Sequence, residues 1–229
     1  MRVERKRKMA GLLTLALIAC LAAPVSAQTS TVGATQLQRL QNGNRRYVNN
    51  RSRNPNDRPN GGTQYPFAAI LSCSDARVPP EILFDQGVND LFVVRVAGNT
   101  VDDPASAHRA VIDSVQLQSL AFAVRSLNVK LIVVLGHDQC GAVKGALQKC
   151  GQPDIGPMFQ NICPAARAVA GSSKEPDQQL KAAIGANVQD QVNVLKSTPP
   201  FAAMVKDGQL RIVGGFTDIK TGRVSILVP

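Results

Sequence analysis

Three short apolar stretches limit what this chain can fold into. They span Pro66–Ser72, Leu91–Ala97 and Val129–Leu135, and each has the length and composition of a buried strand. Between the last two lies the segment Ala105–Leu127, which is long enough for a crossover helix. Repeated strand and helix units of this kind predict an α/β fold, with a mostly parallel β-sheet flanked by helices.

The remaining elements are expected on both sides of this unit. Apolar spacing predicts helices over Gly141–Gln148 and Gln179–Leu195, and a terminal hairpin that pairs Leu210–Val213 with Val224–Val228. Thr35–Asn50 has the apolar stripe of an amphipathic helix. We expect it to form an N-terminal helical arm that packs away from the main body or onto a partner.

The first 27 residues have the pattern of a secretory signal peptide. Basic residues within Met1–Lys8 precede an apolar run over Met9–Ala23, and Val25-Ser-Ala27 offers small residues for cleavage. The apolar run is short for a membrane span, so we expect none after the signal is removed. Residues 28–229 then form a single domain, and a periplasmic or secreted location follows. An alternative is a lipoprotein box that ends at Cys20, which would anchor the chain through lipid.

The charge of the mature chain does not indicate a nucleic-acid partner. Removing five basic residues and Glu4 from the chain's 26 basic and 16 acidic residues leaves a net charge of +6. Arginines between Arg45 and Arg58 form the only loose basic cluster, and only 4% of the residues are aromatic. Single-stranded nucleic-acid sites need basic grooves with stacking aromatics. A solvated helix face and a polar loop explain the cluster better.

Cysteine and histidine follow two of the predicted strands. Cys73 lies in Leu71-Ser-Cys-Ser-Asp-Ala-Arg77, and His137 and Cys140 lie in Leu135-Gly-His-Asp-Gln-Cys-Gly-Ala142. The carboxyl ends of parallel strands meet at one edge of a sheet, where open α/β folds bind ligands. Two thiolates and one imidazole suit zinc, and three protein ligands leave one position for chemistry. The sequence therefore predicts a catalytic zinc site.

Cys150 and Cys163 are the other two cysteines of the mature chain. They flank a loop that contains Gly and Pro, and an exported chain can form disulfides. A bridge between them is favoured over two buried free thiols. Closing so short a loop would contribute about 3 kcal/mol in the chain-entropy model.

Several motifs together resemble the β-class carbonic anhydrases, here of a bacterial, exported kind. They are the stretch from Gln64 to Glu81, Phe84-Asp-Gln-Gly87, Asp90 to Asn99 and Gly136 to Ala142, with Leu40 to Asn44 upstream and Ile212 to Gly215 downstream. The resemblance implies that one zinc ion per subunit activates water, and that zinc-bound hydroxide attacks CO2 to give bicarbonate and a proton. It also implies a homodimer or larger assembly, in which the N-terminal helix embraces the partner.

The resemblance assigns roles to residues around the zinc ligands. Asp75 and Arg77 share one face of an extended segment, and the catalytic Asp75 either accepts a hydrogen bond from zinc-bound water or becomes the fourth ligand. Gln64 would donate to CO2, and Phe92 and Phe122 would form apolar walls, partly from the adjacent subunit. A second reading makes both phenylalanines ordinary core residues.

A helix after Cys140 would point its positive end at the metal, and Gly141 would let the backbone come close to an anionic product. Asp138 stands where the family usually has serine, and its charge is expected to raise the pKa of bound water. His108 is expected to be an exposed residue rather than a ligand.

Two other functions use the same residues. A hydrolase of carbonyl sulfide or carbon disulfide could use the same zinc hydroxide on a similar linear, apolar molecule. A noncatalytic zinc-binding module would need only its ligands, so the presence of Asp75, Arg77 and Gln64 argues against it. No glycine-rich phosphate loop follows the first strand, which disfavours nucleotide binding.

Overall fold

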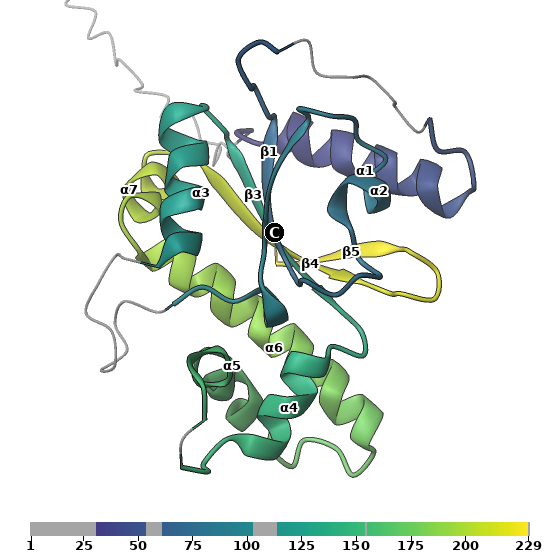
Figure 1. Cartoon of the computed structure of the whole chain (residues 1–229), viewed down its shortest axis with the longest axis vertical. Coiled ribbons are helices and arrows are strands. Elements are labelled where there is room, and N and C mark those ends of the chain that lie inside the picture. The colour runs from purple at the N-terminus through teal and green to yellow at the C-terminus, as the bar shows by residue number, and fades with distance from the viewer. Residues whose placement is uncertain (1–30, 54–60, 103–113, 154, 229) are drawn as a thin grey trace, which may run out of the picture.

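The computed structural model describes residues 31–53, 61–102, 114–153 and 155–228. Within them, five strands form one sheet in the order β2-β1-β3-β4-β5 (Figure 1). The first four are parallel and the last is antiparallel to its neighbour. This arrangement confirms the predicted mostly parallel sheet and the terminal hairpin. The strands are β1 (Ala68–Ser72), β2 (Leu91–Arg95), β3 (Leu131–His137), β4 (Arg211–Thr217) and β5 (Val224–Val228).

The described helices cover both faces of this sheet. They are α1 (Ala34–Val48), α2 (Pro80–Leu83), α3 (Val115–Ser126), α4 (Gly141–Lys149), α5 (Pro157–Ala168), α6 (Pro176–Ser197) and α7 (Phe201–Lys206), with a 3₁₀ turn, η1 (Ala97–Asn99). Figure 1 shows α4 and α5 grouped with α6 at one end of the molecule, and α3 and α7 together beside the sheet. The sequence did not predict α2, α5 or α7.

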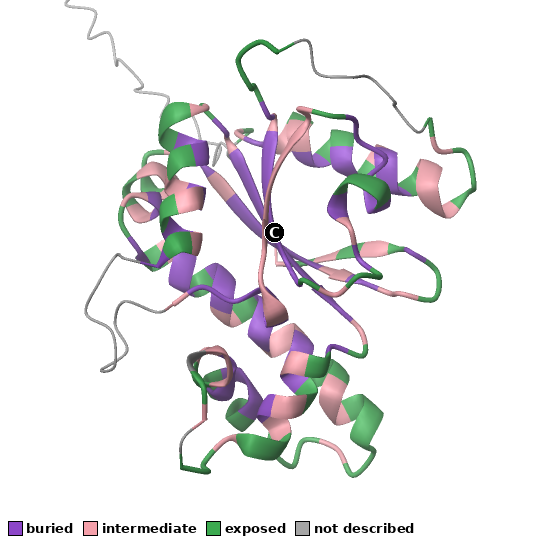
Figure 2. Ribbon diagram, viewed as in Figure 1, coloured by how far each residue is buried: buried purple, intermediate pink, exposed green. Residues whose placement is uncertain are grey.

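The central strands are buried on both faces, as parallel strands with helices on each side must be. Every residue of β1 and β3 is buried, and Figure 2 shows this run of burial through the middle of the sheet. Alternate residues contribute to two core clusters. Ile70 faces the cluster that includes side chains of α1, α4 and α5, whereas Leu71 faces the cluster built with α3 and α7.

Helix α1 packs onto its own chain, so the expectation that it packs away from the main body is wrong. Leu37 and Leu40 belong to the core. Asn44 is buried, and its Nδ2 donates to the carbonyl oxygens of Leu83 (2.9 Å) and Gly222 (2.8 Å). Helix α1 packs beside α2 (Figure 1), and Asn44 also accepts from the Val224 N–H of the β4–β5 hairpin (2.9 Å).

Several expectations concern residues outside the described part of the chain. These are the signal peptide over residues 1–27 with Cys20, the residue His108, Arg58, and the first part of the crossover segment 105–127. The described part of that crossover is α3, which begins at Val115. Among the helices that the structure describes, none combines the length and apolar character that crossing a membrane requires.

Candidate metal centre

The three predicted ligands meet at the carboxyl edge of the sheet. Cys73 directly follows β1, His137 is the last residue of β3, and Cys140 immediately precedes α4. One ligand atom from each side chain lies within 4.8 Å of the other two, and all three residues are buried. The parallel pairing of β1 with β3 brings the strand ends together, although Cys73 lies more than 60 positions before His137 and Cys140.

The imidazole of His137 is oriented for metal binding. Its Nδ1 lies 2.8 Å from the backbone oxygen of Asp138. Because a carbonyl oxygen can only accept, Nδ1 carries the hydrogen and Nε2 presents a lone pair. Nε2 is buried and has no hydrogen-bond partner among the described residues. A metal ion between the three side chains would satisfy this atom, and metal-binding histidines are commonly fixed through their other ring nitrogen in this way.

The two thiols are electrostatically linked. The neighbouring Cys140 thiol lowers the pKa of Cys73 to about 4 against the effect of burial, and the Gly98 N–H, which donates to the Cys73 sulfur, also favours the thiolate. The neighbouring Cys73 thiolate and burial together raise the pKa of Cys140. Each cysteine therefore affects the ionisation of the other. A divalent cation would favour the thiolate form of both, since metal ligation needs both thiolates.

Asp75 and Arg77 form a bidentate ion pair beside Cys73. Arg77 Nε lies 2.9 Å from Asp75 Oδ1, and Nη2 lies 2.7 Å from Oδ2. The Arg77 guanidinium holds the pKa of the Asp75 carboxyl well below its ordinary value. The carboxylate thus stays charged and oriented. This geometry matches the state in which Asp75 is paired with Arg77 rather than bound to metal.

Arg95 is a site residue that sequence reasoning missed. It ends β2, and its Nε and Nη2 donate to the backbone oxygens of Cys73 (3.0 Å) and Asp75 (2.7 Å). These bonds fix the loop that carries both side chains. An arginine at the end of an apolar strand run was the available signal, because burying such a charge requires specific partners.

A single chain does not bring the predicted CO2-binding residues to the metal. Gln64 is exposed and precedes β1, whereas Cys73 follows it. Phe92 pairs with Ala69, roughly 13 Å along the strand from Cys73 at about 3.3 Å per residue. The rings of Phe92 and Phe122 are neighbours, with centroids 6.3 Å apart. These roles therefore require a contribution from a second subunit.

Gly141 opens onto free space at the start of α4. A Cβ added there would meet no atom within 4 Å, apart from its immediate chain neighbours and its own helix backbone. The backbone N–H groups of Ala142 and Val143 favour the thiolate of Cys140 and partly offset the rise of its pKa. The positive end of the helix thus lies beside one ligand, next to a space that an anion could occupy.

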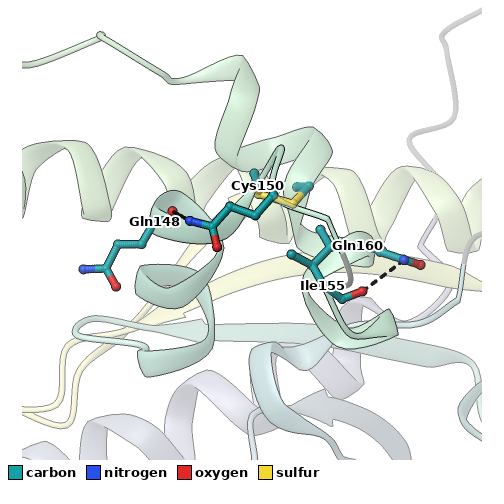
Figure 3. Close-up of a disulfide and its surroundings, with 6 residues drawn as sticks. Gln148, Cys150, Ile155 and Gln160 are labelled. Carbon is teal, nitrogen blue, oxygen red and sulfur yellow. Dashed lines mark hydrogen bonds between the residues drawn. A yellow bond between two sulfur atoms is a disulfide. The ribbon is translucent and has the colours of Figure 1, made fainter.

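Two connections hold the elements next to the site in place: a hydrogen bond of Asp138 and a disulfide between α4 and α5. Asp138 Oδ1 accepts from the Ile219 N–H (2.7 Å), which ties the end of β3 to the β4–β5 turn. Cys150, at the end of α4, is bonded to Cys163 of α5, with 5.5 Å between their Cα atoms (Figure 3). The helix that begins beside the metal ligands is therefore covalently joined to α5.

The known sequences that this chain resembles are carbonic anhydrases. The family model described as carbonic anhydrase matches residues 68–224. Carbonic anhydrase 2 of Mycobacterium tuberculosis is 47% identical over 113 residues, which cover 47% of this chain and 49% of the relative. The chain thus aligns with about half the length of that relative. Carbonic anhydrase of Pseudomonas aeruginosa is 35% identical over 169 residues, covering 72% of this chain and 74% of the relative.

Solved structures share the fold. The β-carbonic anhydrase CcaA superimposes with a TM-score of 0.63 at 26% identity, covering 73% of this chain and 85% of that one. A tetrameric β-carbonic anhydrase from Sordaria macrospora gives a TM-score of 0.62 at 26% identity, covering 72% and 82%.

Proposed function

This chain belongs to the β-class of the carbonic anhydrase family, and we propose that it catalyses the reversible hydration of CO2 to bicarbonate and a proton. One observation carries the proposal: the ligand atoms of Cys73, His137 and Cys140 converge within 4.8 Å, beside a carboxylate that is held by an arginine. A module that only stored metal would need the ligands alone.

The donor set fits zinc. Two thiolates and a neutral imidazole favour zinc over the harder calcium and magnesium ions, and the orphaned Nε2 of His137 needs a partner of this kind. When bound, the ion would supply Lewis acidity that lowers the pKa of water from 15.7 to about 7. Zinc, one per subunit, is therefore the proposed cofactor.

The side chains around the ligands would orient the reacting water and the product. Asp75 stays anionic, so its carboxylate is a hydrogen-bond acceptor that can fix a water molecule beside Cys73. Arg77 prevents the carboxylate from turning, because it holds both oxygens. The amide groups at the start of α4, around Gly141, favour an anion such as bicarbonate.

We infer that the active form is a homodimer or a larger assembly. Strand β2 is the edge of the sheet and all its residues are partly exposed. Near it lie exposed Tyr65 and Phe122. A second subunit on this edge would cover the apolar side chains and could bring Gln64 and Phe122 towards the neighbouring metal centre.

We also propose that the chain is exported to the periplasm or secreted, after cleavage of the signal peptide over residues 1–27. The disulfide between Cys150 and Cys163 supports this, since disulfides persist in oxidising compartments. The mass of the mature N-terminal peptide would test the proposal. A peptide that begins at Gln28 is expected, and a lipidated Cys20 would favour the membrane-anchored alternative.

Stopped-flow CO2 hydration by the zinc-loaded mature protein tests the function. Cys140→Ser should abolish activity, because it removes a ligand. Equal activity in this variant would exclude the zinc mechanism. Carbonyl sulfide and carbon disulfide should be measured alongside, and turnover of either without CO2 hydration would replace the proposed substrate.

A further inference from the structure

We propose that Asn187 of α6 is a positioning residue for the metal centre, because its amide holds the carbonyl of Gly98, the residue whose N–H donates to the Cys73 sulfur. The inference rests on the metal centre proposed above. It extends that centre to a helix that supplies none of the ligands and that follows the last ligand, Cys140, by more than 30 residues.

Two consecutive hydrogen bonds connect Asn187 to the ligand. Asn187 Nδ2 donates to the Gly98 carbonyl oxygen at 2.9 Å. The Gly98 N–H in turn donates to Cys73 Sγ at 3.3 Å. Since a carbonyl oxygen can only accept, the orientation of the Asn187 amide is fixed by this contact. Both bonds are buried.

The burial of Asn187 lacks another explanation among the described residues. Its side chain is 0% exposed, and its neighbours on α6 include the core residues Ile184 and Val188. Its Oδ1 has no hydrogen-bond partner in the described part of the chain. Burying an amide with one unsatisfied end costs free energy relative to an apolar side chain of similar size. The bond to Gly98 is the interaction that offsets this cost.

Asn187 contacts only the Gly98 carbonyl, so its effect on the Gly98 N–H passes through the backbone of this residue, whose conformation is restricted. Its φ is +76°, a conformation that favours glycine, and an added Cβ would lie 2.7 Å from Ile162 Cδ1. On the other side, the Asn99 N–H donates to the Val96 oxygen (2.9 Å), and the Val96 N–H donates to the Ser72 oxygen (3.0 Å). The turn is thus fixed to β1 at one end and to α6 at the other.

A hydrogen bond to a metal-bound thiolate withdraws charge from the sulfur. It stabilises the thiolate before metal binds and makes the sulfur a weaker electron donor afterwards. Substituting residues that hydrogen-bond to metal ligands typically changes metal affinity or activity 10- to 100-fold. Loss of the Asn187 contact should therefore alter both metal affinity and the electronic state of the Cys73 sulfur.

The test uses Co²⁺ bound to the full-length mature protein, because the thiolate-to-cobalt charge-transfer band reports on the sulfur directly. Asn187→Leu removes the donor and keeps a side chain that branches at Cγ. Gln191→Leu is the matched control, since Gln191 lies one turn later on α6, is 1% exposed, and accepts from the Val101 N–H instead (2.8 Å). Affinity is measured by competition with a chelator.

For Asn187→Leu we expect Co²⁺ affinity to fall by about 10-fold or more, and the charge-transfer band to move to longer wavelength. Gln191→Leu should keep the wild-type affinity and band. If Asn187→Leu does not fold, Asn187→Ala is judged by the same two measurements. An unchanged band in the Asn187 variant, or the same shift in the control, would overturn the inference. A wild-type protein that binds no Co²⁺ would instead remove the proposed metal centre itself.

Discussion

The Asp75–Arg77 pair sets a pH dependence at the scale of single residues. Arg77 lowers the pKa of Asp75 in the folded state, whereas the unfolded carboxyl has a pKa of about 3.9. The pair's contribution to stability is fully present above pH ~4 and is lost as the pH falls through the folded-state pKa. Arg77→Met should lower the free energy of unfolding in urea at pH 7 only slightly, because Arg77 is half exposed and solvent screens the ion pair. This difference from wild type should shrink below pH ~4.

The same substitution should affect catalysis more than stability. Without Arg77 the Asp75 carboxylate can turn away from the metal centre, and misplacing a catalytic group by about 1 Å can cost about 10²-fold in rate. Stopped-flow kcat/KM should fall accordingly. Arg223→Met, which changes an exposed arginine of the β4–β5 turn, should leave kcat/KM unchanged. Wild-type kcat/KM in Arg77→Met would contradict the role of the pair.

Asp138 combines a charge near the metal with a structural hydrogen bond, and two substitutions separate them. Asp138→Asn removes the charge but keeps an oxygen that can accept from the Ile219 N–H. Asp138→Ser removes both. If the charge hinders ionisation of water at the metal, both variants should shift the midpoint of the pH–rate profile downward. A shift in the serine variant alone would assign the effect to the β4–β5 turn. No shift in either variant would reject the proposed effect of the Asp138 charge.

At the scale of elements, the docking of α1 depends on a close approach between backbones. A Cβ on Gly43 would lie 1.7 Å from the Phe84 oxygen. Gly43→Ala should therefore force α1 away from α2 and destabilise the protein by about 1–3 kcal/mol in urea unfolding. Gly185→Ala in α6 is the control. Apart from its chain neighbours and its own helix backbone, no described atom lies within 4 Å of its added Cβ, so helix propensity should make that variant more stable by about 0.5–1 kcal/mol.

The disulfide makes the α4–α5 connection sensitive to reductant. Because Cys150 and Cys163 are 13 residues apart, the cross-link should contribute about 3 kcal/mol to stability. Reduction should remove this contribution and add two hydrogens to the intact mass. The double variant Cys150→Ala/Cys163→Ala should be as unstable as the reduced protein and should not respond to reductant. A wild-type mass that reduction leaves unchanged would exclude the cross-link.

Some elements were predictable from the sequence, and others had no pattern to reveal them. The sequence predicts the strands and the metal ligands from the same pattern, because apolar runs end directly at Cys73 and close to His137. The surface against which α1 packs was not predictable, since an apolar stripe indicates burial but not which elements bury it. Helix α5 contains Pro164, which normally interrupts a helix. Asn187 resembles a surface residue in sequence, and only the contact with Gly98 explains its burial.

At the scale of the whole molecule, the position of exposed apolar side chains predicts which edge of the sheet pairs with a second subunit. Phe122 and Leu227 are almost equally exposed, at 47% and 46%, but Phe122 contacts Phe92 of edge strand β2 whereas Leu227 lies on the opposite edge strand, β5. A buried charge at a subunit interface is strongly unfavourable. Phe122→Asp should therefore yield monomers in sedimentation velocity experiments, and Leu227→Asp should retain at least a dimer.

Loss of the proposed dimer should then also cause loss of CO2 hydration. If Gln64 and Phe122 complete the site of the neighbouring subunit, the Phe122→Asp monomer should bind zinc with wild-type affinity but lose most of its CO2 hydration. Zinc binding should persist because Cys73, His137 and Cys140 come from one chain. A fully active monomer would show that each chain builds its CO2 pocket alone. Dissociation of Leu227→Asp to monomers would instead place the essential interface on β5.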